Sequence, residues 1–212
     1  CIDKLQGVYV PFWLFDCNAD GTVHFNATRV STWRSGDYRY TKTSHFLVIR
    51  GGHMAFEKIP VDASEKMDDS YMDSLEPFDY RDLTEFGTAY LSGFLADRFD
   101  VSAKASAPRA SRRVKQSLED SLRSTVHGYA SVTTRSTDIH TSDSQVKYAM
   151  LPVYILNTKY KGKPYFFAMN GQTGKFVGKL PISWGRFFAW AGGIAAAAVA
   201  LGQLFLLAGG MF

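Results

Sequence analysis

The chain has 212 residues, of which 46% are hydrophobic, and its 24 Lys and Arg residues against 20 Asp and Glu residues give a net charge of +4. This composition is too apolar for a disordered tail and too poor in Pro and Gly for a collagen-like chain, and its two Cys cannot supply a disulfide framework. The length allows one or two domains, counted at about 150 residues each.

The first segment, residues 7–58, reads as β-structure. Its apolar runs are short and rich in β-branched and aromatic side chains, which is typical of buried strands. The expected strands are residues 7–15, 22–30, 38–43 and 45–50. The polar stretch 16–21 predicts a turn between the first two strands, and Pro11 favours an edge position or a bulge.

Residues 65–126 read as a helical insert. Apolar residues recur at three- and four-residue spacing over 71–100 and over 114–126, which predicts two amphipathic helices. Nine acidic residues lie between Asp62 and Glu85, against two basic ones. The second helix is accompanied by the basic residues Arg109, Arg112, Arg113 and Lys115. Solvated faces explain both charge runs, and a mutual docking of the two helices is the alternative.

Residues 128–182 predict a second β-segment. An apolar run at 148–156 precedes a strand at 164–169, the hairpin signal Asn170-Gly171 and a returning strand at 175–180. The pentapeptides at 10–14 and 151–155 share an apolar-Pro-apolar design. We therefore expect an α+β fold: two antiparallel β-meanders, either a weak internal repeat or independent segments, flank the helical insert and precede one C-terminal transmembrane helix.

The C-terminal run 187–212 contains no charged residue over 26 positions, which is long enough to cross a hydrocarbon core of about 30 Å. A buried core helix is the alternative, but such a helix normally carries a polar stripe, and here only Gln203 interrupts the run. We expect a domain over residues 1–183 and a transmembrane helix over 184–212.

The flanks of this helix indicate its orientation. Basic residues precede it, and no acidic residue follows Asp143, so the positive-inside rule places the domain in the cytoplasm and the protein in the cytoplasmic membrane as a single-pass protein. The basic stretch would also attract anionic lipids. The residues expected to anchor the helix at the membrane surface are Trp184, Arg186, Phe187, Phe188 and Trp190.

Small residues recur at four-residue spacing along the helix, which allows a close approach of two helices in lipid and hence a homo-oligomer. The expected packing residues are Gly192, Gly193, Ala196, Ala197 and Ala200. The frequency of Ala and Gly in membrane helices is the alternative explanation.

Several short motifs resemble known sites without completing them. Residues 16–21 open like a calcium loop, but position twelve is Ala27 where a Glu is required. Residues 171–175 resemble a phosphate-binding loop, but its first Gly and its Ser or Thr are missing, so a hairpin turn is expected. The five His residues show no metal-ligand spacing. We expect no catalytic, cofactor or metal site in this chain.

Five segments, taken in order, resemble a bacterial family of TFIIB-type zinc-ribbon-containing membrane proteins. They are residues 7–16, 59–64, 76–78, 90–100 and 170–175. In that family a zinc ribbon with paired Cys-x-x-Cys motifs precedes this region, so the resemblance implies zinc in an N-terminal region absent from this chain. Cys1 in place of an initiating Met indicates a fragment or a processed form.

Three functions remain open at this stage. The absence of a catalytic motif favours a membrane-tethered cytoplasmic binding or scaffold module with an unknown protein partner. A membrane-bound hydrolase would use Asp16, His24 or His45 between the β-meanders. A nucleic-acid adaptor would act through the zinc ribbon with help from Arg112 and Arg113, although nucleic acid is not the expected partner of this fragment.

Overall fold

The computed structural model describes residues 2–160, 162–178 and 183–209. They divide into two compact units, Cys1–Gly178 and Lys179–Phe212. The first unit combines an antiparallel sheet with helices, which confirms the expected α+β class, and the second contains one helix.

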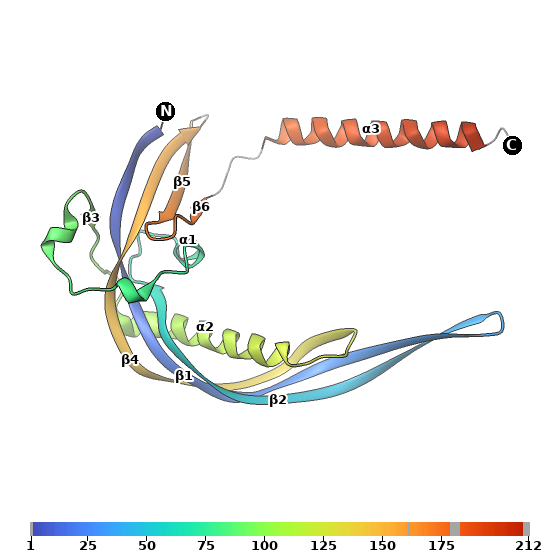
Figure 1. The fold of residues 1–212 in the computed structure, drawn as a ribbon, viewed down its shortest axis with the longest axis horizontal. Coiled ribbons are helices and arrows are strands. Elements are labelled where there is room, and N and C mark those ends of the chain that lie inside the picture. The colour runs from blue at the N-terminus through green and yellow to red at the C-terminus, as the bar shows by residue number, and fades with distance from the viewer. Residues whose placement is uncertain (1, 161, 179–182, 210–212) are drawn as a thin grey trace. The chain divides into compact units, whose positions relative to one another are not determined.

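The first unit is built on one sheet in which both expected β-segments take part (Figure 1). Its strand order is β2-β1-β4-β5-β6, and the short β3 pairs in parallel with β1. The strands are β1 (Ile2–Ser35), β2 (Tyr38–Asp62), β3 (Leu95–Ala96), β4 (Ser131–Tyr160), β5 (Lys163–Asn170) and β6 (Phe176–Gly178). The first and second β-segments join through β1 and β4, which pair from Ile2↔Thr158 to Thr28↔Ser131.

The turn expected at 16–21 is wrong, because β1 runs through these residues without a break. Their polar side chains belong to a strand paired on both sides, with Asp20 opposite His53 on β2 and His140 on β4. The irregularity lies in the neighbours: the register with β2 shifts after Phe15, and Lys58 takes a positive φ of 55° there while its amide donates to the Asp16 carboxylate. The strand expected over 45–50 also continues further, because Gly51 and Gly52 lie inside β2.

Gly21 is required by the close approach of β4 rather than by a turn. A Cβ built on Gly21 would meet the Asp138 carbonyl oxygen and lie 2.6 Å from the Ile139 Cα, both backbone atoms that cannot move aside. We expect Gly21→Ala to lower the free energy of unfolding by about 1–3 kcal/mol. Gly51→Ala is the matched control on the paired strand, since its Cβ would meet nothing closer than 3.4 Å. Equal denaturant midpoints for the two variants would contradict this explanation.

Two prolines end two ladders in the same way. Pro11 accepts the amide of Ala63 just beyond the last β1–β2 pair, and Pro152 accepts the amide of Gly171 just beyond the last β4–β5 pair. Each proline thus lies just beyond the end of a ladder, where its missing N–H removes no ladder hydrogen bond. The two similar pentapeptides lie on adjacent strands, with Val10 opposite Leu151.

The sheet buries an apolar cluster on each face. Residues of β1 alternate between the faces, so even-numbered ones from Val8 to Leu14 join one cluster and odd-numbered ones from Phe15 to Ala27 join the other. Helix α2 (Ala103–Ser124) packs on the second cluster through Ala110, Val114, Leu118 and Leu122. Helix α1 (Asp69–Ser74) and the following loop cover the first through Met72, Leu75 and Phe78.

The helix expected over 71–100 is wrong. This stretch holds the end of α1, two short 3-10 turns (Tyr80–Asp82 and Thr88–Leu91) and β3. Pro77 follows α1 closely, and Gly93 adopts a positive φ of 82°, so neither position continues a helix. The apolar spacing instead reflects separate side chains that pack on the sheet from a loop. The second helix is longer than expected, because Ser102 caps it at Ala105 and Pro108 is accommodated inside its first turns.

The acidic and basic segments dock on each other, but the acidic side is the short α1 and its neighbours rather than the long helix that the docking alternative expected. Arg109 of α2 contacts the carboxylates of Asp62, Asp69 and Asp73 at 2.6–2.9 Å. Arg113 binds Glu76 at 2.7 Å and donates to the carbonyl of Pro60. This network joins α1, the end of β2 and the start of α2.

The second unit contains α3 (Trp184–Gly209), within which Gly185–Gln203 is long and apolar enough to cross a membrane. None of that stretch is buried. The expected span 187–212 ends at residues 210–212, which lie outside the described residues.

Candidate functional site

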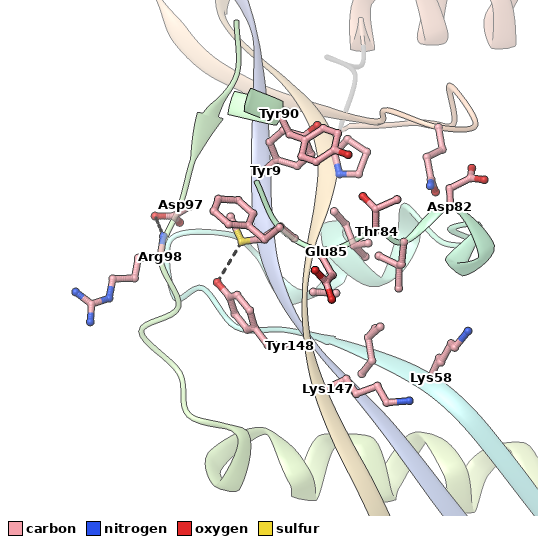
Figure 2. A pocket seen from close by; sticks show the side chains of 18 residues that line it. Tyr9, Lys58, Asp82, Thr84, Glu85, Tyr90, Asp97, Arg98, Lys147 and Tyr148 are labelled. Carbon is pink, nitrogen blue, oxygen red and sulfur yellow. Dashed lines mark hydrogen bonds between the residues drawn. The ribbon is translucent and has the colours of Figure 1, made fainter. Parts of the chain in front are cut away.

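A cavity of about 830 Å³ in the first unit lies along the edge of β4 (Figure 2). Residues 147–152 of β4 form one wall, and residues 82–86, which begin with the last residue of the first 3-10 turn, form the other. The remaining lining residues are Tyr9, Leu14, Lys58, Tyr90, Asp97, Arg98 and Gln172.

The cavity is centred on a strand edge without a neighbour. β5 pairs with β4 only from Val153 to Tyr160, whereas β1 continues along the other side of β4. Because Pro152 directs its carbonyl toward β5, the alternation of an antiparallel ladder turns the backbone groups of Met150 and Tyr148 to the same outer edge. Within the described part of the chain, no residue hydrogen-bonds the outward amides and carbonyls of these two residues.

Aromatic side chains surround this edge. Tyr148 packs edge-on against Trp13 and Phe99, with ring centroids 5.2 and 5.7 Å away, and its hydroxyl donates to the Met150 sulfur at 3.1 Å. Burial raises the pKa of Tyr148, so the phenol stays protonated at neutral pH. Phe86 and Tyr90 line the cavity and are 62% and 53% exposed. Such exposure of large rings beside a cavity marks a contact surface for a ligand.

The charges around the cavity balance. Lys58, Arg98 and Lys147 are basic, and Asp82, Glu85 and Asp97 are acidic. Burial raises the pKa of the Asp97 carboxyl, but the hydrogen bonds from Lys66 at 2.6 Å and Ser64 at 2.8 Å outweigh it and lower that pKa. The lining therefore offers no excess charge that would select a phosphate or another small ion.

The turn that resembles a phosphate-binding loop closes one end of the cavity and is a hairpin turn, as expected. The buried Asn170 side chain accepts the amides of Gln172 and Thr173 and donates to the carbonyls of Leu75 and Pro77. Gln172 exchanges hydrogen bonds with the backbone of Asp79 at 2.9 and 3.1 Å. The Lys175 ammonium donates to the Glu76 carbonyl. These contacts fix residues 75–79, from which the second cavity wall continues.

The structure does not bring together the residues named for a hydrolase. Asp16 and His24 lie eight residues apart on one strand, a separation of about 26 Å along an extended chain. His45 is exposed on β2 opposite Thr28, and none of the three lines the cavity. The described residues 2–160, 162–178 and 183–209 contain no group of three His, Cys, Asp or Glu side chains placed to hold a metal ion.

The basic cluster considered for nucleic acid is divided by the fold. Arg109 and Arg113 are committed to carboxylates, whereas Arg112 and Lys115 are exposed on the outer side of α2. Neutralising Arg113 would therefore destabilise the fold as well as weaken any surface that binds nucleic acid.

The membrane-anchor residues occupy the start of α3. Trp184 is its first residue, and Phe187, Phe188 and Trp190 are exposed, with the two Phe rings edge-on at 5.5 Å. The expected packing residues, from Gly192 to Ala200, are also exposed. A Cβ added at Gly192 or Gly193 would meet no atom within 4 Å, so the helix surface is open there.

Sequence reasoning missed the cavity, because the free edge of β4 depends on where β5 ends. Pro152 was the one available signal: a proline within an apolar run marks a strand edge. The apolar spacing of residues 71–100 instead predicts that the rings of Phe86 and Tyr90 belong to the face of a helix.

Comparison with known proteins finds one similar chain of interest. The Bacillus subtilis (strain 168) protein YdjG, which is described as an uncharacterized protein, is 43% identical over 212 residues. The match covers all of this chain and 62% of YdjG, so the chain spans less than two thirds of its relative. No family model matches this chain, and no solved structure matches it.

Proposed function

We propose that this chain is a membrane-tethered docking module that binds an extended segment of a partner protein along the outer edge of β4. The observation that carries the proposal is the pair of outward backbone groups at Tyr148 and Met150 inside a cavity lined by aromatic rings. A peptide that adds as a strand gains main-chain hydrogen bonds from such an edge and selectivity from the pockets beside it.

The shape of the site favours a peptide over a small polar substrate. A bound strand would continue the sheet position of β5, which ends opposite Val153. Alternate side chains of that strand would meet Tyr148 and Met150 on one face and Ala149 and Leu151 on the other. The balanced charges of the rim suit a peptide of mixed composition.

The membrane part of the proposal rests on sequence. The stretch Gly185–Gln203 would span the bilayer once, and the basic residues before it would keep the first unit in the cytoplasm. Membership of the TFIIB-type zinc-ribbon-containing family, with zinc in a preceding region, belongs to the same proposal. A module of this kind would hold its partner at the membrane surface.

Photocrosslinking tests the docking site. We place p-benzoylphenylalanine at Phe86 in the full chain and irradiate native membranes, with and without Met150→Pro. Proline removes the outward amide of residue 150 but no bond to β1, so we expect the protein adduct to fall at least tenfold while the unfolding midpoint is unchanged.

Ala149→Pro is the matched control, because residue 149 turns its amide toward β1 and the substitution should destabilise the sheet. An adduct that persists in Met150→Pro, or adducts formed with lipid alone, would refute the docking site.

A further inference from the structure

The hairpin of β1 and β2 extends beyond the rest of the sheet as a two-stranded arm, residues 29–44 (Figure 1). The pairing of β1 with β4 stops at Thr28, opposite the first residue of β4, whereas β1 and β2 stay paired as far as Ser35 and Tyr38. All residues from 29 to 43 are exposed. A two-stranded ribbon is marginally stable alone in water, so we do not expect the arm to stabilise the core.

Basic residues without acidic partners gather on the arm. It carries Arg29, Arg34, Arg39 and Lys42 against Asp37, which leaves 4 − 1 = +3. Arg29 donates to the Gly128 carbonyl and lies over the rings of Phe46 and Tyr129. In the described part of the chain, the other three cations form no ion pair.

Two of these cations oppose each other directly. Arg34 pairs with Arg39 across the ribbon, which places like charges on neighbouring side chains of one face. Such a pair destabilises a sheet unless an anion lies between the charges. The arrangement therefore selects a partner that presents phosphate or carboxylate groups.

Aromatic rings add an amphipathic component on the other face. Trp33 stacks on Tyr40, with ring centroids 5.6 Å apart and an angle of 14°, and Tyr38 beside the turn is 71% exposed. Trp and Tyr have an apolar body and a polar edge, and they concentrate at the headgroup level of membranes.

We propose that the tip of this arm docks on the anionic headgroups of a lipid bilayer, with Arg34, Arg39 and Lys42 on phosphates and Trp33, Tyr38 and Tyr40 at the interface. The Arg34–Arg39 pair lies on one face of the ribbon and the rings lie on the opposite face, so a tip that enters the headgroup layer engages both faces at once. A nucleic acid lying along the ribbon would reach one face, and the mutual stacking of Trp33 and Tyr40 occupies ring faces that bases would need. This inference rests on the membrane tether of the proposed function, which keeps the arm within reach of a bilayer.

Hydrogen exchange of the full chain in nanodiscs tests the arm. We compare nanodiscs of phosphatidylcholine alone with nanodiscs of equal parts phosphatidylcholine and phosphatidylglycerol. The amides of residues 29–44 should exchange more slowly in the anionic nanodiscs only. Each cation near an anionic leaflet strengthens binding to it about fivefold. The variant Arg34→Gln, Arg39→Gln, Lys42→Gln should therefore lose roughly 100-fold in the affinity of the arm for the anionic leaflet. Its amides should then exchange at the rate seen in phosphatidylcholine nanodiscs.

A matched variant, Lys104→Gln, Arg112→Gln, Lys115→Gln, removes the same charge from exposed positions of α2 and should keep the arm protected. Equal exchange in both lipids would overturn the inference, as would protection by a single-stranded oligothymidylate but not by the anionic lipid. Slow exchange of α3 in the same samples reports the tether separately, so failure of the arm is distinguishable from failure of the proposed function.

Discussion

Arg109→Ala should lower the free energy of unfolding by about 3–5 kcal/mol, because it leaves a buried carboxylate without its partner. The Asp62 side chain is 1% exposed and lies 2.6 Å from the Arg109 guanidinium. The same guanidinium also holds Asp69 and Asp73, so its loss leaves three acidic residues close together. Burial raises the pKa of Asp62, Arg109 lowers it, and the carboxylates of Asp69 and Asp73 raise it, so that the pKa lies above its usual value.

Urea denaturation of the full chain in detergent measures this loss. Arg112→Ala is the control, since Arg112 belongs to the same basic cluster but is exposed. The double variant Asp62→Asn, Arg109→Met should recover part of the loss, because a neutral pair avoids the buried charge. Equal losses for Arg109→Ala and Arg112→Ala would show that the ion-pair network does not stabilise the fold.

Phe25→Ala should also cost about 3–5 kcal/mol, whereas Trp33→Ala should cost at most about 1 kcal/mol. Both rings belong to β1 and point to the same face, since their numbers differ by an even count. Phe25 is fully buried beneath α2, and Trp33 is 49% exposed beyond it, in contact with Tyr40.

Thermal unfolding of the two variants distinguishes a core residue from an arm residue on one strand. A large loss for Trp33→Ala would mean that the arm supports the fold, and its exposed rings would then need no membrane partner. A small loss for Phe25→Ala would contradict the position of α2 over β1.

The two β-segments, the apolar C-terminal helix and the hairpin at Asn170-Gly171 follow from local patterns in the sequence. Apolar period, turn residues and an uncharged run each act within about 10–26 neighbouring residues, so the chain reveals them directly. The opposite charges of residues 62–85 and 109–115 allow an interaction, but the sequence alone favoured solvated faces over docking.

Tertiary structure decided what depends on neighbours distant in sequence. The polar stretch 16–21 carries the composition of a turn, yet pairing with β2 and β4 on both sides keeps it extended. The apolar residues of 71–100 follow a helical period, yet packing on the sheet and the breaks at Pro77 and Gly93 prevent a helix. The open edge of β4 exists because β5 ends at Asn170, and the arm exists because β4 begins at Ser131. Both sites arise from unequal strand lengths within one sheet, a property of long-range pairing that no local pattern encodes.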